Sequence, residues 1–174
     1  SYITNDTYVA NIFRNNIDDA INLAKQAYEI GIKAIALFPQ VPSERKDNYG
    51  KEALNGNNII CRAVKDIKKN ISDIGIICDV ALDPYTTSGH DGILKNHEVD
   101  NDKTIEVLCE QAVLNAKCGC DVIAPSDMMD GRIKFIRESL DKANCQDTIM
   151  MSYAAKYASA YYGPFRNAIS ASSN

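Results

Sequence analysis

Helix-like and strand-like segments alternate along this chain, and the alternation limits the folds open to it. Amphipathic helices are predicted over residues 17–30, 59–70, 101–117 and 131–143. Apolar segments of strand length follow them, at residues 32–38, 74–81, 121–124 and 148–152. The near-continuous apolar run at 74–81 is typical of a parallel strand covered on both faces. Gly31 stands where the first helix needs a left-handed cap. The pattern predicts an α/β protein with a parallel sheet.

Parallel strands joined by helices form either an open doubly wound sheet or a (β/α)8 barrel. Polar side chains follow three of the predicted strands: Asp79 and Asp83, then Ser126 and Asp127, then Tyr153 and Lys156. In a barrel the carboxyl ends of the strands surround one cavity, where catalytic residues gather. No Gly-x-Gly-x-x-Gly or Walker-type loop follows any strand. We therefore predict the TIM-barrel family, with residues 1–174 in a single domain.

Composition narrows the possible partners. The 174 residues carry a formal net charge of −4, and acidic and basic residues are interspersed. This distribution gives no electrostatic footprint for nucleic acid or an anionic membrane, so a small-molecule or protein partner is expected. No apolar run approaches the roughly 20 residues of a membrane helix, and the first residues do not resemble a signal peptide. Six scattered cysteines, most of them in apolar segments, indicate a reducing compartment, which we take to be the cytoplasm.

The densest polar cluster lies at residues 79–92. Asp79 and Asp83 follow a strand, and Asp91 returns behind a Gly-His pair. Such carboxylates can hold a hard cation or place proton-transfer groups around a bound amine. The alternative is that Asp79 and Asp83 cap loops and that Asp91 and Gly92 form a turn.

The segment 124–132 is a strand exit followed by a helix entry. Ser126 or Asp127 can either cap the next helix or face the predicted cavity, and the local sequence favours neither. The nearby Cys118-Gly119-Cys120 precedes a buried strand and has no second cysteine pair at metal-site spacing. A metal site is therefore not expected at these two cysteines.

Lys156 stands just past the strand at 148–152, among small and aromatic residues. Burial among apolar walls can lower the pKa of a lysine from near 10.4 to about 7–8. The free amine can then form a Schiff base with a carbonyl compound. A surface lysine at a strand end is the alternative. The neighbouring aromatic side chains favour a pocket: Tyr157, Tyr161, Tyr162 and Phe165.

Together these blocks resemble the porphobilinogen synthase (5-aminolevulinate dehydratase) family, barrel enzymes that condense two molecules of 5-aminolevulinate with loss of water in haem and porphyrin biosynthesis. The segments that carry the resemblance occur in the order the family has them: 79–85, 89–92, 124–132, 153–159 and 162–166. The resemblance implies a lyase that works through lysine Schiff bases.

The resemblance also implies roles for individual residues. Lys156 would be one of the family's two Schiff-base lysines. Arg166 would grip the substrate carboxylate, and Phe165 would form part of the pocket wall. The residues expected to orient the substrate and assist proton transfer are Asp79, Ser126 and Asp127.

Zinc-dependent members of this family have three cysteines where this chain has Ala81, Asp83 and Asp91. Alanine has no ligand atom and carboxylates are harder ligands than thiolates, so no catalytic zinc is expected. The chain is similar to the aspartate-rich branch, which implies magnesium or a monovalent cation whose ligands lie outside this chain. No metal ligand is assigned, and Asp83 and Asp91 are expected to line the substrate site.

The family's second Schiff-base lysine belongs to a later segment that these residues do not include. We therefore expect the chain to form about half of a barrel and to be inactive alone, and the complete enzyme to be a homo-octamer or homo-hexamer. Two other functions stay open: a Schiff-base aldolase on the same barrel, and an inactive half that only binds a partner or a small carbonyl compound.

Overall fold

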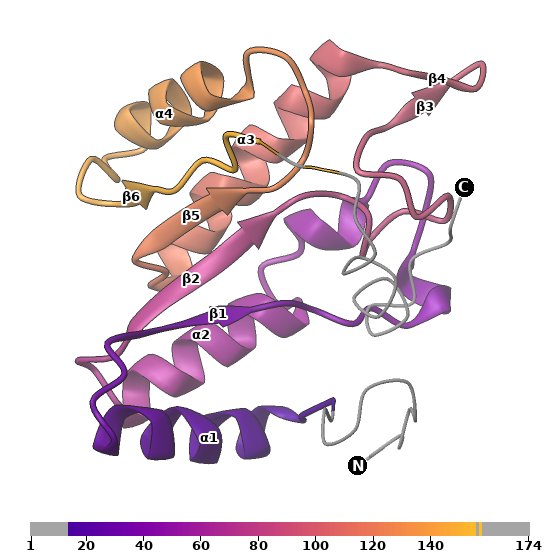
Figure 1. Ribbon diagram of the computed structural model, residues 1–174. Helices are drawn as coiled ribbons and strands as arrows, with labels where there is room; N and C mark the ends of the chain where they lie inside the picture. Colours follow the sequence, from indigo (N-terminus) through magenta and orange to yellow (C-terminus); the bar gives the residue numbers. More distant parts are fainter. Residues whose placement is uncertain (1–13, 156, 158–174) are drawn as a thin grey trace.

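The computed structural model describes residues 14–155 and 157 of the 174 residues. A parallel sheet lies against a layer of α-helices, and the chain alternates between the two layers as predicted (Figure 1). The elements, in chain order, are α1 (Ile17–Glu29), β1 (Ala34–Leu37), the 3-10 helices η1 (Ser43–Arg45) and η2 (Lys51–Leu54), α2 (Ile59–Asn70), β2 (Gly75–Val80), β3 (Leu94–Lys95), β4 (Glu98–Val99), α3 (Asn101–Cys118), β5 (Val122–Pro125), α4 (Arg132–Lys142) and β6 (Ile149–Met150).

Side-chain caps and glycines set the ends of the helices. Asn16, Asn58 and Asp100 each accept a hydrogen bond from the backbone N–H three residues further on, which satisfies a free donor in the first turn of α1, α2 and α3. Gly31 follows α1 with φ 91°, and Gly119 ends α3 with φ 108°. Both glycines adopt the left-handed conformation that residues with a Cβ avoid.

The sheet order is β1-β2-β5-β6, and all three pairings are parallel. Each of these strands therefore lies beside the next parallel strand along the chain. Sequential parallel strands with helices on the outside form the arrangement of a (β/α)8 barrel. The predicted fold class is confirmed, with this chain forming about half of such a barrel.

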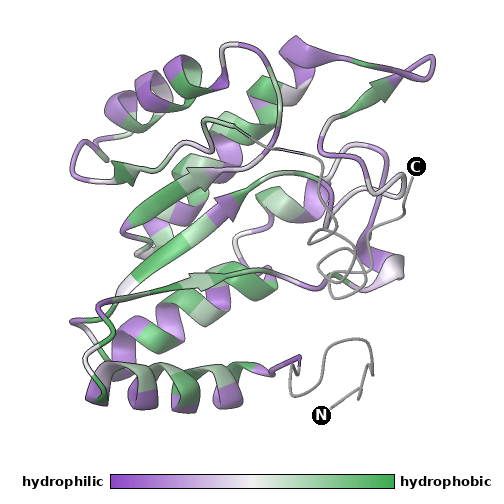
Figure 2. Ribbon diagram, in the orientation of Figure 1, coloured by the Kyte–Doolittle hydropathy of each residue, from purple (hydrophilic) through white to green (hydrophobic). Residues whose placement is uncertain are grey.

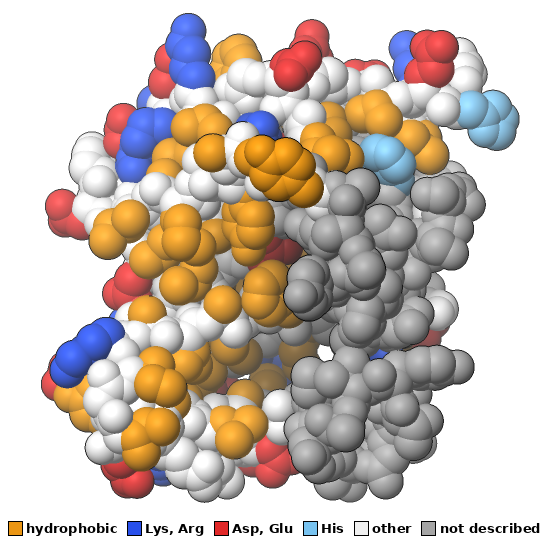
Figure 3. All heavy atoms as spheres, in the orientation of Figure 1, with side chains coloured by type: hydrophobic (Ala, Val, Ile, Leu, Met, Phe, Trp, Pro, Cys, Tyr) orange, Lys and Arg blue, Asp and Glu red, His pale blue; other side chains and the backbone are white. Residues whose placement is uncertain are grey.

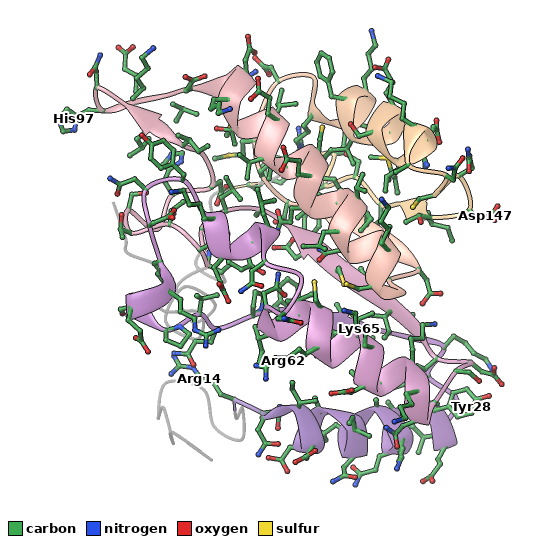
Figure 4. All side chains as sticks on the ribbon, turned by 180° about the vertical axis from the view of Figure 1, so that it is seen from behind. Arg14, Tyr28, Arg62, Lys65, His97 and Asp147 are labelled. Carbon is green, nitrogen blue, oxygen red and sulfur yellow. The ribbon has the colours of Figure 1, made fainter. Side chains whose placement is uncertain are left out.

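The two faces of the sheet differ sharply. On the helix side, Ile76, Cys78, Val80 and Ile123 have no exposed surface. The helices pack in chain order along this side, α1 on α2, α2 on α3 and α3 on α4, as the view from behind shows (Figure 4). Apolar residues of the strands and helices meet in the layer between them (Figure 2). The core of the described chain lies here.

The opposite face of the sheet is open in the described residues. Ile77, Val122 and Ile149 lie in register across β2, β5 and β6, on the side away from the helices, and Ile149 is 61% exposed. Hydrophobic side chains gather on this face (Figure 3). The expectation that the 74–81 strand is covered on both faces is therefore met on one face only. In a closed barrel the second face is the packed interior.

Some elements were not predicted. Residues 94–102 contain the β3–β4 hairpin, with the exposed His97 at its tip (Figure 4). The 3-10 helices η1 and η2 were also missed. Strand β6 is shorter than predicted, although the N–H groups of Met151 and Tyr153 still donate to Ile123 and Pro125 of β5. No helix in the described part of the chain is both long and apolar enough to cross a membrane.

Candidate functional site at the carboxyl ends of the strands

The loop after β2, residues 81–93 (the β2 loop), is organised by His90. The Nδ1 atom of His90 accepts a hydrogen bond of 2.9 Å from the N–H of Gly92, and its carbonyl oxygen accepts one of 3.0 Å from the hydroxyl of Thr86. The N–H of His90 donates to the hydroxyl of Ser88. His90 thus fixes the backbone on both sides of Asp91, a role that the sequence reading did not assign to it.

Gly92 lets this loop approach its neighbours closely. A Cβ atom at this position would lie 2.9 Å from Cγ1 of Val99 and 3.1 Å from Cε of Met129. The next residue, Ile93, donates its N–H to the Thr104 hydroxyl of α3 at 2.9 Å. The β2 loop is therefore packed against the loop that follows β5 and anchored to α3.

The loop after β5, residues 126–131 (the β5 loop), buries a carboxylate. Asp127 is 1% exposed, and its Oδ1 accepts a hydrogen bond of 2.8 Å from the N–H of Met129. Helix α4 begins after Gly131, at φ 80°, without a side-chain cap. The interpretation of Ser126 or Asp127 as a helix cap is thus wrong, because the turn at Met128 and Met129 separates both residues from the first turn of α4.

The surroundings of Asp127 raise the pKa of its carboxyl group. Burial raises the pKa of Asp127 from its ordinary 3.8 to about 6, although the N–H of Met129 and the guanidinium of Arg132 oppose the rise. The negative charge of Asp91 pushes the pKa of Asp127 upward as well. Nε of Arg132 lies 3.3 Å from Oδ2 of Asp127. A carboxyl group that titrates near neutral pH is suited to proton transfer.

The two loops meet at one edge of the sheet. Asp79 is paired with Ala124 of the neighbouring strand and lies on the face away from the helices. The N–H of Ser126 donates to the carbonyl of Val80 at 3.3 Å. Asp79 and Ser126 therefore leave adjacent strands side by side, and Asp127 follows directly. Asp83 and Asp91 are half-buried in the β2 loop.

Three predicted site residues, Lys156, Phe165 and Arg166, lie outside the described residues, so their roles stay predictions. The strand that leads to Lys156 is placed beside β5, through the bond of 3.5 Å from the N–H of Tyr153 to the carbonyl of Pro125. Of the aromatic neighbours expected to form a pocket, the structure describes Tyr157, which is 79% exposed.

The residues present do not fit a zinc site of thiolates. Ala81 is 2% exposed and offers no ligand atom. Within residues 14–155 no group of three or more His, Cys, Asp or Glu side chains is arranged to hold a metal ion. Cys118 and Cys120 are buried in the apolar core behind the sheet.

A sequential parallel sheet with polar residues at its carboxyl edge defines this chain as part of a TIM-barrel protein, a class whose catalytic residues gather at the strand ends. The family model for delta-aminolevulinic acid dehydratase matches residues 5–174. The chain belongs to that family.

Curated relatives agree with this assignment. The delta-aminolevulinic acid dehydratase of Bradyrhizobium diazoefficiens is 53% identical over 156 residues, which are 90% of this chain and 44% of the relative. The enzyme of Chlamydia pneumoniae is 45% identical over 159 residues, 91% of this chain and 48% of the relative. The chain thus spans about half the length of the curated relatives it matches.

A solved structure also matches. The chain resembles delta-aminolevulinic acid dehydratase (porphobilinogen synthase) from Toxoplasma gondii ME49, determined in complex with the reaction product porphobilinogen. The two share 39% sequence identity with a TM-score of 0.96, and the match covers 99% of this chain and 49% of the other.

Proposed function

We propose that the protein carrying this chain is a porphobilinogen synthase, a lyase that condenses two molecules of 5-aminolevulinate into porphobilinogen with loss of water. The observation that carries the proposal is the close match to a structure that holds porphobilinogen. The gathering of Asp79, Ser126 and Asp127 at one edge of the sheet supports it, because that edge is where barrel enzymes place their chemistry.

Lys156 is proposed as the nucleophile. Its free amine attacks the ketone of 5-aminolevulinate, water leaves, and an imine forms. The protonated imine draws electrons from the adjacent carbon, which makes that carbon acidic and allows a carbon–carbon bond to form. Arg166 would bind the substrate carboxylate, and Phe165 would form part of the pocket wall. These roles rest on the family resemblance.

The described acids supply the proton transfers in this proposal. Asp127, with its pKa raised to about 6 by burial, is half-ionised at about pH 6 and can both accept and donate a proton. Asp79 faces the side of the sheet that becomes the barrel interior, and Ser126 stands beside it on the next strand. Asp83 and Asp91 would line the substrate site from the β2 loop.

We further propose that no catalytic zinc takes part, because buried Ala81 replaces one thiolate and carboxylates replace the others. Magnesium or a monovalent cation, bound by residues outside this chain, is the proposed metal. The proposed setting is a homo-octamer or homo-hexamer in the cytoplasm, without nucleic acid or membrane partners. The six free cysteines support a reducing compartment.

The test is borohydride trapping in the intact protein that carries this chain. With 5-aminolevulinate present, reduction is expected to attach substrate mass to the peptide containing Lys156, and porphobilinogen is expected to accumulate without borohydride. Lys156→Arg keeps the charge but should abolish that adduct. A folded protein with no adduct at Lys156 and no porphobilinogen would contradict the proposal.

The same experiment separates the other functions. Cleavage of a sugar phosphate, with trapping of its carbonyl product on Lys156, would indicate a Schiff-base aldolase. Binding of 5-aminolevulinate without turnover or an adduct would indicate a binding protein.

A further inference from the structure

Arg132 connects the β5 loop with the segment after β6, which leads in sequence to the proposed nucleophile. It is the first residue of α4, and its side chain is 17% exposed. One terminal nitrogen donates to the carbonyl of Met129 at 3.2 Å and the other donates to the carbonyl of Tyr153 at 3.3 Å. Its Nε lies 3.3 Å from Oδ2 of Asp127. The guanidinium of Arg132 therefore contacts two residues of the β5 loop, Asp127 and Met129. It also contacts Tyr153 in the segment that follows β6.

One of these partners has a role in the proposed chemistry, and another precedes the proposed nucleophile in the chain. Asp127 is the buried acid of the β5 loop. Tyr153 stands three residues before Lys156 on the same strand exit. Backbone hydrogen bonds also join β5 to the chain after β6, from the N–H of Met151 to Ile123 at 2.9 Å and from the N–H of Tyr153 to Pro125 at 3.5 Å. The guanidinium adds a side-chain connection between the acid and the chain that leads to the lysine.

The geometry requires an arginine rather than any cation. A guanidinium presents its donors in a rigid planar fork, whereas an ammonium is a point charge on a flexible stem. Lysine at this position can keep the attraction to Asp127 but cannot reach two carbonyl oxygens in fixed directions at the same time.

The contact with Asp127 also leaves an acceptor available. Oδ2 of Asp127 and Nε of Arg132 are both buried, and neither has a hydrogen-bond partner among the described residues. Their contact is therefore a charge attraction without hydrogen-bond alignment. Oδ2 keeps lone-pair capacity for a proton from another group, while Oδ1 is held by Met129.

We propose that Arg132 is a positioning residue, which holds the carboxylate of Asp127 and the backbone leading to Lys156 in one fixed relation. The inference rests on the proposed function. It assigns no contact with substrate to Arg132, which acts through Asp127 and Tyr153.

The same helix offers a matched control. Arg137 of α4 donates to the carbonyl oxygens of Thr148 and Cys145, at 2.8 and 3.0 Å, and pairs with Asp141. The terminal nitrogens of Arg137 thus bind backbone carbonyl oxygens just before β6, whereas one terminal nitrogen of Arg132 binds a carbonyl oxygen just after β6. Arg137 lies away from the carboxyl ends of the strands, so its loss should affect folding stability alone.

The experiment compares Arg132→Lys and Arg132→Met with Arg137→Lys and Arg137→Met in the intact protein. Arg132→Lys is expected to lower kcat roughly 10- to 100-fold, because small displacements of reacting groups cost this much, with KM within about twofold of wild type. Arg137→Lys and Arg137→Met should lower Tm and leave kcat unchanged.

A pH profile adds a readout that a purely structural role would not move. Among the described residues, the charged groups that act on Asp127 are Arg132 from α4 and Asp91 from the β2 loop. Removing the cation raises the pKa of Asp127, so Arg132→Met should move the acid limb of kcat upward by about one pH unit. Arg132→Lys should restore most of that shift without restoring kcat.

Equal losses of kcat at Arg132 and Arg137, or an acid limb that does not move in Arg132→Met, would overturn the inference and leave the proposed function intact. If Arg132→Met does not fold, Arg132→Lys against Arg137→Lys decides through kcat. Wild-type protein that forms neither porphobilinogen nor an adduct at Lys156 would overturn the proposed function and this inference with it.

Discussion

Oδ2 of Asp121 lies 2.7 Å from Nζ of Lys68 and accepts a hydrogen bond of 2.7 Å from the N–H of Ile76. The backbone of Asp121 also bonds to Ile76 and to Ile149, so this residue joins the amino ends of β2, β5 and β6. In barrels this end of the sheet serves stability, whereas the carboxyl end serves catalysis. The two ends should therefore respond differently to mutation.

Asp121→Ala should lower the free energy of unfolding by about 1–3 kcal/mol, because it leaves the buried N–H of Ile76 without its acceptor. Lys68→Met should cost less than about 1 kcal/mol, since both side chains of this ion pair are partly exposed. Urea unfolding measures both losses. Equal losses of unfolding free energy in the two variants would contradict the role given to Asp121. A lowered kcat in either folded variant would contradict the division between a stabilising amino end and a catalytic carboxyl end of the sheet.

Asp127 should make stability depend on pH. Burial raises the pKa of Asp127 from 3.8 to about 6, so between these pH values the folded state binds more protons than the unfolded state. The contribution of Asp127 to the free energy of unfolding therefore falls as pH rises through this window. Asp127→Asn cannot ionise, so its stability relative to wild type should rise from pH 4 to 6 in urea titrations. A constant difference over that range would argue against the raised pKa.

Gly92→Ala should destabilise the protein by about 1–3 kcal/mol, because the new methyl group meets Val99 and Met129 inside a packed region. The strain falls beside Asp91, so kcat should drop as well. Gly56→Ala is the matched control, since a Cβ there has a single neighbour, Leu114, at 4.0 Å. Thermal unfolding that shifts equally in both variants would refute the role of close packing at Gly92.

The buried thiols should resist alkylation until the protein unfolds. Burial, with a hydrogen bond to Cys118, raises the pKa of Cys61 to about 12, and the hydrogen bond to Cys120 with burial raises the pKa of Cys78 well above 9.0. Thiols react as thiolates, so iodoacetamide at pH 8 should reach the half-buried Cys145 before the buried Cys61 and Cys78. Peptide mass spectrometry gives the order, and native labelling of Cys61 as fast as Cys145 would rule out this protection.

Helix α2 was predicted to the residue, because local signals agree there. The cap at Asn58 satisfies the first turn, and the apolar residues of the helix recur with a helical period, on the face that is buried against the sheet. Where the conformation of a residue depends on its neighbours in the chain, the sequence is sufficient to predict the secondary structure.

The β3–β4 hairpin escaped prediction because its turn lacks a glycine. Asn96 and His97 both have positive φ, 52° and 67°, as a tight hairpin turn requires. Asn is a recognised signal for this conformation, but His at the second position is not, so Asn96 was the one clue available.

At the site, the strand-end acids were predicted because parallel strands end at one edge of the sheet. The roles of His90 and Arg132 were not, since they depend on how the loops fold back. Arg132 reaches Tyr153 across 21 residues of chain, and Gly92 admits Met129 from another loop. Neither contact leaves a periodic or local signal in the sequence.

The strand order β1-β2-β5-β6 also affects how the molecule can be made. Each of these four strands pairs with the next of the four along the chain. No pairing among them therefore has to wait until a later member of the sheet has been synthesised. Contacts between neighbours in sequence favour fast folding. A growing chain on the ribosome can therefore add one strand and one helix at a time.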